Sequence, residues 1–212
     1  MALIKLAKIN EDSFWAAWKI EEPIDTLIRE CQLAEDDLRE WSLIHHPIKQ
    51  AEWLGSRAAL TAILRALDAP PQPTYKDDKG KPFLRNSIFH ISLANSSPYG
   101  VAILHQHQAV GIDIEKPSDK LQRIQHKFLT PLEIRAIDDR PAYYCAYWCV
   151  KESLYKLYGR KQLSLKDNIA VHSVHFNDII RAEASICIDQ LASAYYLEGT
   201  IIDGFFVIYS VV

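Results

Sequence analysis

Hydrophobic residues recur at helical spacing in two long segments of the chain. In the first, residues 48–67, Trp53, Leu60 and Leu64 share one face. The two prolines at 70–71 end this helix. In the second segment, residues 142–158, the pattern predicts another helix, which Gly159 terminates. Two helices of this length predict a fold in which apolar helix faces pack against other elements.

The remaining apolar segments show strand patterns. Residues 88–104 predict two strands that a turn at 95–100 separates, and residues 109–115 predict a third. The pair Asp203-Gly204 lies between two apolar runs, 195–202 and 205–212, which is a strong hairpin signal. Residues 74–86 read as a loop or a short exposed strand. We therefore expect an α+β fold in which long helices pack against antiparallel sheet.

A further helix start is marked by a capping sequence. Thr130 can cap the backbone, Pro131 suits the first helical position, and Glu133 completes a capping box. The first 45 and the last 45 residues carry no motif that indicates a function.

Composition narrows the class of protein. The 212 residues suit one large domain or two small ones, and a net charge of −3 gives no basic field for nucleic acid. The four cysteines form no CxxC motif and are expected to be reduced thiols of a cytoplasmic protein. The segment 91–112 lacks formal charge, but polar residues interrupt it, so we expect no membrane span.

Two carboxylates occupy alternate positions of the strand at Gly111-Ile112-Asp113-Ile114-Glu115. Alternation predicts that the isoleucines face the core while Asp113 and Glu115 point the other way together. All-oxygen donors of this kind favour a hard cation such as Mg²⁺. Solvated acids on a half-exposed strand would give the same pattern, so this motif alone does not decide between the two interpretations.

Charged residues also line the second helix. Trp148, Glu152 and Lys156 are spaced i, i+4, i+8 and share a face, with Lys151 beside them. An exposed Glu–Lys pair is the plain alternative. The five tyrosines nearby make the helix too aromatic for a simple solvated face, which favours a site.

Basic groups precede both motifs. Arg57 lies at the edge of the first helix's apolar stripe, where it needs an anionic partner, either a protein carboxylate or a ligand phosphate. Lys81 lies on the loop Gly80-Lys81-Pro82, and His90-Ile-Ser-Leu-Ala-Asn95-Ser96 runs from a strand into a turn. The chain contains neither GxxxxGK[ST] nor GxGxxG, so no P-loop or Rossmann turn holds a nucleotide.

In this order, GKP at 80–82, HISLANS at 90–96, GIDIE at 111–115 and WCVKESLYK at 148–156 resemble the 4'-phosphopantetheinyl transferases of the Sfp (surfactin-synthetase-activating) type. The resemblance covers roughly residues 57–165. It implies a monomer of two similar α+β halves, residues 1–107 and 108–212, related by a pseudo-twofold with the active site in the cleft between them. Both long helices place a charged residue four positions after a tryptophan, Trp53 and Trp148, which fits such a duplication.

The resemblance also implies roles for individual residues. Asp113, Glu115 and Glu152 are implied to bind Mg²⁺ (Mn²⁺ is an alternative), and Asp113, Glu152 and Lys156 to be catalytic. Coenzyme A, the co-substrate, would be held by Lys151 and Lys156 at its pyrophosphate and by Arg57, Lys81 and His90 at its adenosine phosphates, with Asn95 and Lys49 as further contacts. The implied partner is an apo acyl or peptidyl carrier protein, whose serine takes the phosphopantetheine while 3',5'-ADP leaves.

One departure from the family's pattern is visible. Many relatives have Ser-His-Ser where this chain has Ala94-Asn95-Ser96. Asn95 can still donate a hydrogen bond to phosphate but carries no charge. Two other functions stay open: a magnesium-dependent phosphotransferase or phosphodiesterase that acts on a free nucleotide, and a carrier-protein binder of the same fold without turnover.

Overall fold

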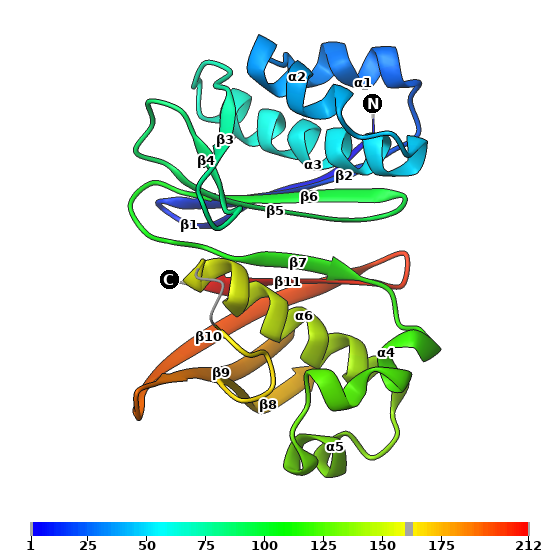
Figure 1. The fold of residues 1–212 in the computed structure, drawn as a ribbon, viewed down its shortest axis with the longest axis vertical. Coiled ribbons are helices and arrows are strands. Elements are labelled where there is room, and N and C mark those ends of the chain that lie inside the picture. The colour runs from blue at the N-terminus through cyan, green and yellow to red at the C-terminus, as the bar shows by residue number, and fades with distance from the viewer. Residues whose placement is uncertain (1, 160–162, 212) are drawn as a thin grey trace. The chain divides into compact units, whose positions relative to one another are not determined.

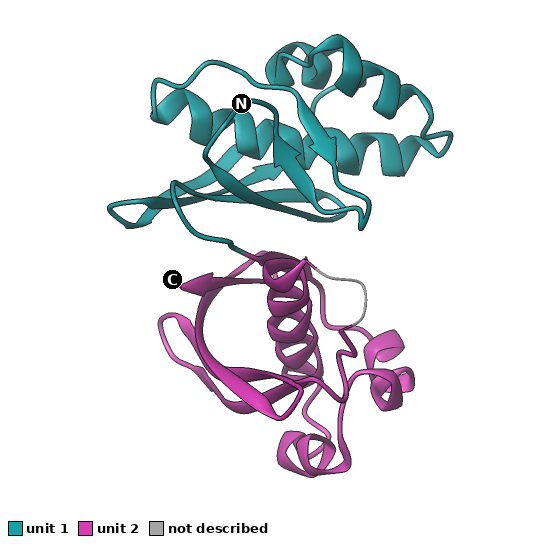
Figure 2. Cartoon of the chain, turned by 60° about the vertical axis from the view of Figure 1, so that its left-hand side comes forward, with its two compact units in different colours: residues 1–110 teal, residues 111–212 magenta. Residues whose placement is uncertain are grey.

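The computed structural model describes residues 2–159 and 163–211. Backbone contacts divide the chain into two compact units, unit 1 (residues 1–110) and unit 2 (residues 111–212), which are coloured separately in Figure 2. Each unit combines antiparallel sheet with helices, so the expected α+β class is confirmed. None of the helices formed by the described residues is long and apolar enough to cross a membrane.

Unit 1 is built on a four-stranded antiparallel sheet in the order β1-β2-β6-β5 (Figure 1). Its strands are β1 (Leu3–Asn10), β2 (Ser13–Lys19), β5 (His90–Ser96) and β6 (Tyr99–His105). The helix α3 (Pro47–Ala66) packs on β2 and β6. Two shorter helices, α1 (Ile24–Cys31) and α2 (Glu35–Ser42), and the small hairpin of β3 (Thr74–Lys76) and β4 (Pro82–Leu84) complete the unit.

Unit 2 contains a five-stranded antiparallel sheet in the order β7-β11-β10-β9-β8. The strands are β7 (Ile112–Glu115), β8 (Ile169–Phe176), β9 (Ile180–Ile188), β10 (Leu191–Ile202) and β11 (Phe205–Val211). Figure 2 shows the sheet curving around α6 (Pro141–Tyr158). The short helices α4 (Asp119–Arg123) and α5 (Pro131–Ile137) and the 3-10 turn Gln125–Lys127 lie between β7 and α6 in sequence.

The two long helices match the sequence pattern closely. Helix α3 begins one residue before the predicted segment and ends one residue before its end, and Pro47 occupies its first turn. Helix α6 begins at Pro141 and ends at Gly159, whose φ of 69° is the left-handed conformation that glycine adopts at little cost. The capping box of Thr130 and Glu133 also forms at the start of α5. Local signals were sufficient for these elements.

The predicted strands form with small shifts in their bounds. Strands β5 and β6 pair as expected, and Asp203 and Gly204 both have positive φ in the two-residue turn between β10 and β11. The strand expected at 109–115 is shorter, because β7 begins at Ile112. Residues 2–45 held no motif, yet they supply β1, β2, α1 and α2.

Candidate active site

Strand β7 presents its two carboxylates to α6, which differs from the expected arrangement. The alternation is as predicted, but both faces of the strand are covered: Ile112, Asp113 and Ile114 are all buried. Asp113 pairs with Ile208 of β11, which belongs to the core beneath α6. The acids therefore lie on the helix side of the sheet, and Asp113 is not a solvated group.

Asp113 is held by one lysine and is only partly satisfied. Its Oδ1 accepts a hydrogen bond of 2.7 Å from Lys156 Nζ, which also donates to the Ile112 carbonyl at 3.1 Å. Its Oδ2 is buried and has no hydrogen-bond partner among the described residues. Burial raises the pKa of Asp113, and the Lys156 charge opposes this rise. One oxygen of this carboxylate thus remains available to a further positive group.

Glu152 joins Asp113 from the helix. Its pKa rises to about 7 because this half-buried carboxylate is partly removed from water and because Asp113 repels its charged form, while Lys156 opposes both effects. Glu115 is half-buried, and its charge adds to the rise in the pKa of Asp113. Asp113 therefore lies within electrostatic range of Lys156 and of two further carboxylates, Glu115 and Glu152, with an excess of negative charge around it.

The donor set fits a hard divalent cation in its chemistry. Carboxylate oxygens are the protein ligands that Mg²⁺ prefers, and the partnerless Asp113 Oδ2 needs a positive neighbour. However, the described residues contain no group of three or more His, Cys, Asp or Glu side chains arranged to hold a metal ion. Asp113, Glu115 and Glu152 therefore do not form a three-ligand metal site in this structure, in which Lys156 bonds to Asp113.

Lys151, the implied second pyrophosphate contact, bonds to protein groups in this structure. It is fully buried, and its Nζ donates to Glu133 Oε2 at 2.9 Å and to the carbonyls of Leu165 (3.0 Å) and Ile169 (2.7 Å). Three acceptors use all three donors of an ammonium group. In this structure Lys151 ties α6 to α5 and β8, and its implied pyrophosphate contact stays a prediction.

Glu133 was recognised in the sequence only as a helix cap. Besides accepting from Thr130 at 2.8 Å, it accepts from the Val171 amide at 3.0 Å and pairs with Lys151. Two sequence signals, the capping box and the lysine of the KE pair, belong to one buried network. No local pattern could have indicated this, because the partners are 18 residues apart.

Arg57 of unit 1 is buried, and protein groups surround it. Its guanidinium stacks on Trp53 with the central carbon 3.6 Å from the ring centroid, and Nη1 donates to Ser56 at 3.3 Å. Burial lowers its pKa to about 10, against the attraction of Glu40 and Asp37. Of the two partners foreseen for this arginine, protein carboxylates lie within electrostatic range, without an ion pair to Arg57 among the described residues.

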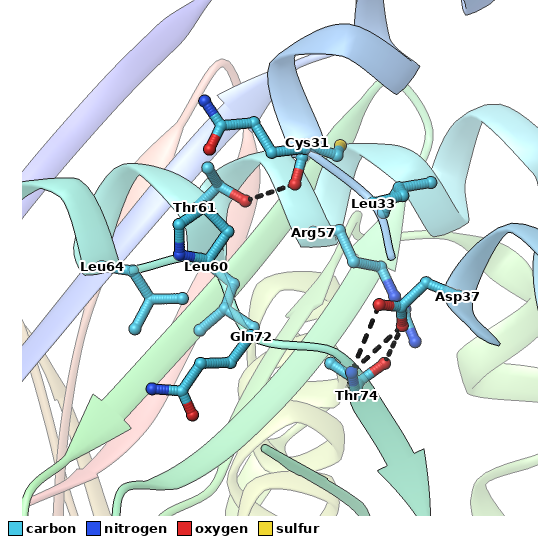
Figure 3. Close-up of a pocket in the computed structure, with 11 residues that line it drawn as sticks. Cys31, Leu33, Asp37, Arg57, Leu60, Thr61, Leu64, Gln72 and Thr74 are labelled. Carbon is cyan, nitrogen blue, oxygen red and sulfur yellow. Dashed lines mark hydrogen bonds between the residues drawn. The ribbon is translucent and has the colours of Figure 1, made fainter. Parts of the chain in front are cut away.

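The pocket beside Arg57 is small. Figure 3 shows Arg57 next to Asp37, whose carboxylate accepts from the amide and the hydroxyl of Thr74. The cavity measures about 20 Å³, which is enough for one water molecule but not for a phosphate group. Arg57 Nε has no partner among the described residues, so it is a candidate donor to such a water.

The other expected coenzyme A contacts form two groups, one near the first residue of β5 and one near its end. His90 begins the strand, and the charge of Lys81 lies close enough to lower its pKa, after burial as the larger cause. Asn95, which is exposed, lies five residues further along, roughly 16 Å away at strand spacing. Lys49 is exposed and pairs with Glu52, whose other oxygen accepts from the Ser97 amide beside Asn95. These residues therefore do not gather at a single point.

Comparison with known proteins adds one finding. The family model of the 4'-phosphopantetheinyl transferase superfamily matches residues 109–204, a span that lies almost entirely in unit 2 and contains Asp113, Glu115, Glu152 and Lys156. A search of the curated proteins finds no match to the chain. The match supports a transferase that handles phosphopantetheine, and it rests on the unit that carries the carboxylates.

Proposed function

We propose that the chain is a magnesium-dependent transferase of the Sfp type. It moves the 4'-phosphopantetheine group of coenzyme A to a serine of an apo acyl or peptidyl carrier protein and releases 3',5'-ADP. The observation that carries the proposal is the buried Asp113 carboxylate, with one oxygen on Lys156, the other without a partner, and Glu152 beside it. The superfamily match over the same residues supports this reading.

The proposed reaction assigns each side chain a step. The serine oxygen forms a bond to the phosphorus nearest the pantetheine, and the bond from this phosphorus to the bridging oxygen breaks. Glu152 accepts the serine proton. Lys156 donates a hydrogen bond to the departing pyrophosphate oxygens. Mg²⁺, held by Asp113, Glu115 and Glu152, would neutralise negative charge on the phosphoryl oxygens.

The chain itself supplies no nucleophile in this scheme. Cys145 and Cys149 are the thiols nearest to the carboxylates, and both are completely buried. Burial raises the pKa of Cys149 well above its ordinary value, and its Sγ contacts the Phe206 carbonyl at 3.7 Å. A thiol in this state is a poor nucleophile, which agrees with a reaction in which the partner's serine attacks.

The proposal extends to the organisation of the molecule. We take the two units as the two related halves of an Sfp-type enzyme, since each contains one long helix packed on antiparallel sheet. One chain would then carry all parts of the enzyme and act as a monomer in the cytoplasm. Recognition of coenzyme A by Lys81, His90, Asn95, Lys49 and Arg57 belongs to the same proposal.

A transfer assay tests the proposed function. The purified protein is incubated with MgCl₂, coenzyme A and a panel of apo carrier proteins, and mass spectrometry measures the mass added to the carrier serine. Asp113→Ala should remove the transfer, and Asp178→Ala, at an exposed position of the β8–β9 turn, serves as the matched control. Full modification of the carrier serine in excess chelator would contradict the proposed magnesium requirement. Turnover of free nucleotides without carrier modification would favour the alternative phosphotransferase.

A further inference from the structure

Helix α6 approaches the start of β7 without room for a side chain. Gly111 directly precedes β7, and a Cβ at this position would lie 1.8 Å from the Ser153 carbonyl oxygen and 2.9 Å from the Leu157 amide nitrogen. Unbonded heavy atoms do not come this close, so a larger residue at this position would push the helix and the strand apart. Figure 1 shows α6 lying across β7 and β11, on which it packs.

Two buried serine hydroxyls hold the same junction from the side of β11. Ser210 Oγ accepts from the Gly111 amide at 3.0 Å, and the Ser210 amide donates to the Gly111 carbonyl at 3.0 Å. Ser153 Oγ donates to the Ile208 carbonyl at 2.8 Å. Both serines are fully buried, so these hydrogen bonds do not compete with water. The helix and the two strands are thus joined by direct bonds at one point.

This junction lies directly beside the candidate site. Asp113 pairs with Ile208 of β11, whose carbonyl accepts the Ser153 hydroxyl. Glu152 directly precedes Ser153 in α6. Lys156, further along the same helix, reaches Asp113 Oδ1 at 2.7 Å. The carboxylates of the strand and of the helix therefore extend from backbone positions whose separation the junction fixes.

We propose that Gly111 and Ser153 are positioning residues, which set the distance between Asp113 on β7 and Glu152 on α6 and thereby the affinity for a divalent cation. Gly111 has no side chain, and the Ser153 hydroxyl donates to a carbonyl of β11, so both act through other residues. The use of this cation in catalysis rests on the proposed function.

The chemistry of Mg²⁺ explains why the spacing matters. This ion demands near-ideal octahedral geometry with oxygen ligands at about 2.0–2.1 Å. Because the backbones of α6 and Gly111 are already in contact, only side-chain rotation can bring the carboxylates around a cation. Any increase in the distance between helix and strand therefore weakens the metal site before it disrupts the fold of the unit.

Electron paramagnetic resonance of MnCl₂ mixed with the full chain tests the spacing without requiring turnover, because Mn²⁺ loses its free-ion signal when it binds. Binding that Asp113→Ala removes is assigned to the candidate site. Ser153→Ala deletes the bond to β11 without adding volume, and it should weaken this binding about tenfold, the scale of removing a partner outside the ligand shell. Ser56→Ala is the matched control, because this buried serine of α3 also donates to a backbone carbonyl. It should leave the Mn²⁺ affinity unchanged.

Gly111→Ala should weaken Mn²⁺ binding further, by up to about 100-fold, because the added methyl group must move α6 away from β7. Gly100→Ala is its control, since a Cβ there would lie 2.1 Å from the Gly55 carbonyl carbon in α3. Thermal melts establish that each variant is folded at the temperature of the titration. Both glycine variants should lose stability, but only Gly111→Ala should also lose Mn²⁺ affinity. If Gly111→Ala does not fold, Ser153→Ala decides.

A transfer assay on the same proteins separates this inference from the proposed function. In Ser153→Ala the MgCl₂ concentration needed for transfer should rise, while the KM for coenzyme A holds. If Ser153→Ala weakens Mn²⁺ binding but wild type modifies no carrier, the positioning role stands and the proposed function falls. Carrier modification by wild type, together with wild-type Mn²⁺ affinity in folded Ser153→Ala, overturns the inference alone. Equal weakening in Ser56→Ala also overturns it, as does the absence of Mn²⁺ binding that depends on Asp113.

Discussion

Helices α3 and α6 occupy comparable places in the two units, and their differences are instructive. Each begins with a proline and carries a tryptophan, Trp53 or Trp148, in its middle part. Each also meets a glycine of its sheet region almost without a gap. A Cβ on Gly100 would lie 2.1 Å from the carbonyl carbon of Gly55 in α3, and a Cβ on Gly111 would lie 1.8 Å from the Ser153 oxygen in α6. Both helices therefore sit as close to the sheet as backbones allow.

The two helices differ in the electrostatic surroundings of the charged residue four positions after the tryptophan. In α3 it is Arg57, which faces the carboxylates Asp37 and Glu40 and stacks on Trp53. In α6 it is Glu152, which faces a charge of its own sign at Asp113. The first position places a buried charge near carboxylates of opposite sign, and the second gathers charges of one sign that need an external cation. The same helical offset thus serves stability in unit 1 and is a candidate for chemistry in unit 2.

The largest expected effect comes from Glu152→Gln. The substitution keeps the shape of the side chain but removes the charge and the ability to accept a proton. Transfer to a carrier serine should fall by about 10²–10⁴-fold, the scale of losing a general base. Coenzyme A affinity, measured by calorimetry, should remain, because the residues proposed to recognise its adenosine phosphates lie in unit 1.

Glu183→Gln is the matched control for this variant, because Glu183 is an exposed glutamate of β9. It should transfer at the wild-type rate. Near-normal turnover in Glu152→Gln would show that Glu152 is only a half-buried partner of Lys156. It would contradict the proposal that Glu152 is the general base.

The next largest effect concerns the buried pair of Lys151 and Glu133. Lys151→Met should destabilise the protein by about 3–5 kcal/mol, because it leaves a buried carboxylate without its cation. The double variant Glu133→Gln/Lys151→Met should recover part of this loss, because it removes the buried charge; the single glutamine oxygen can accept from only one of the two amides, Thr130 or Val171, that the two glutamate oxygens serve. Urea denaturation measures both variants.

The same double variant decides the role of Lys151 in catalysis. If Lys151 only positions α6, transfer should return together with stability, and its KM for coenzyme A should match that of wild type. A stable double variant with no transfer would instead restore Lys151 as a phosphate contact. Helix α3 offers no counterpart to this test. Lys151 directly precedes Glu152 in α6, whereas the residue that precedes Arg57 in α3 is the uncharged Ser56.

The sequence predicted the elements whose signals are local and failed where partners are distant. The limits of α3 and α6, the turn at 203–204 and the cap at Thr130 follow from prolines, glycines and spacing within a few residues. The pattern at 111–115 could not tell a solvated Asp113 from one at a site, because alternation shows which residues share a face but not which face a helix covers. The burial of Lys151 could not be predicted either, because its partners Glu133, Leu165 and Ile169 are 14 to 18 residues away in sequence.

Arg57→Met tests the stabilising role of α3. The methionine retains apolar contact with Trp53, but Asp37 and Glu40 lose a buried positive neighbour. We expect the free energy of unfolding to fall by about 1–3 kcal/mol. Arg65→Met on the same helix is the control, because Arg65 pairs with Glu30 at the surface and such pairs contribute about 0–1 kcal/mol. Unchanged stability in Arg57→Met would contradict the stabilising role, and weaker coenzyme A binding would support the ligand contact proposed above.

The smallest effect is a pH dependence of stability in unit 2. Glu152 has a pKa of about 7 in the folded chain against 4.5 as its ordinary value, so between these values the folded state holds more protons than the unfolded state. In chelator, stability should therefore fall as the pH rises from 4.5 to 7, by on the order of 1–2 kcal/mol, and level off above 7. Asp113, whose pKa is also raised, contributes in the same direction.

The variant Glu152→Gln should remove most of this pH dependence of stability. In wild type, MgCl₂ should reduce it, because a cation among the carboxylates removes the penalty on their charged forms. Thermal melts across this pH range, with and without MgCl₂, measure both effects. A wild-type slope that Glu152→Gln leaves unchanged would mean that the excess negative charge does not lie at this position of α6.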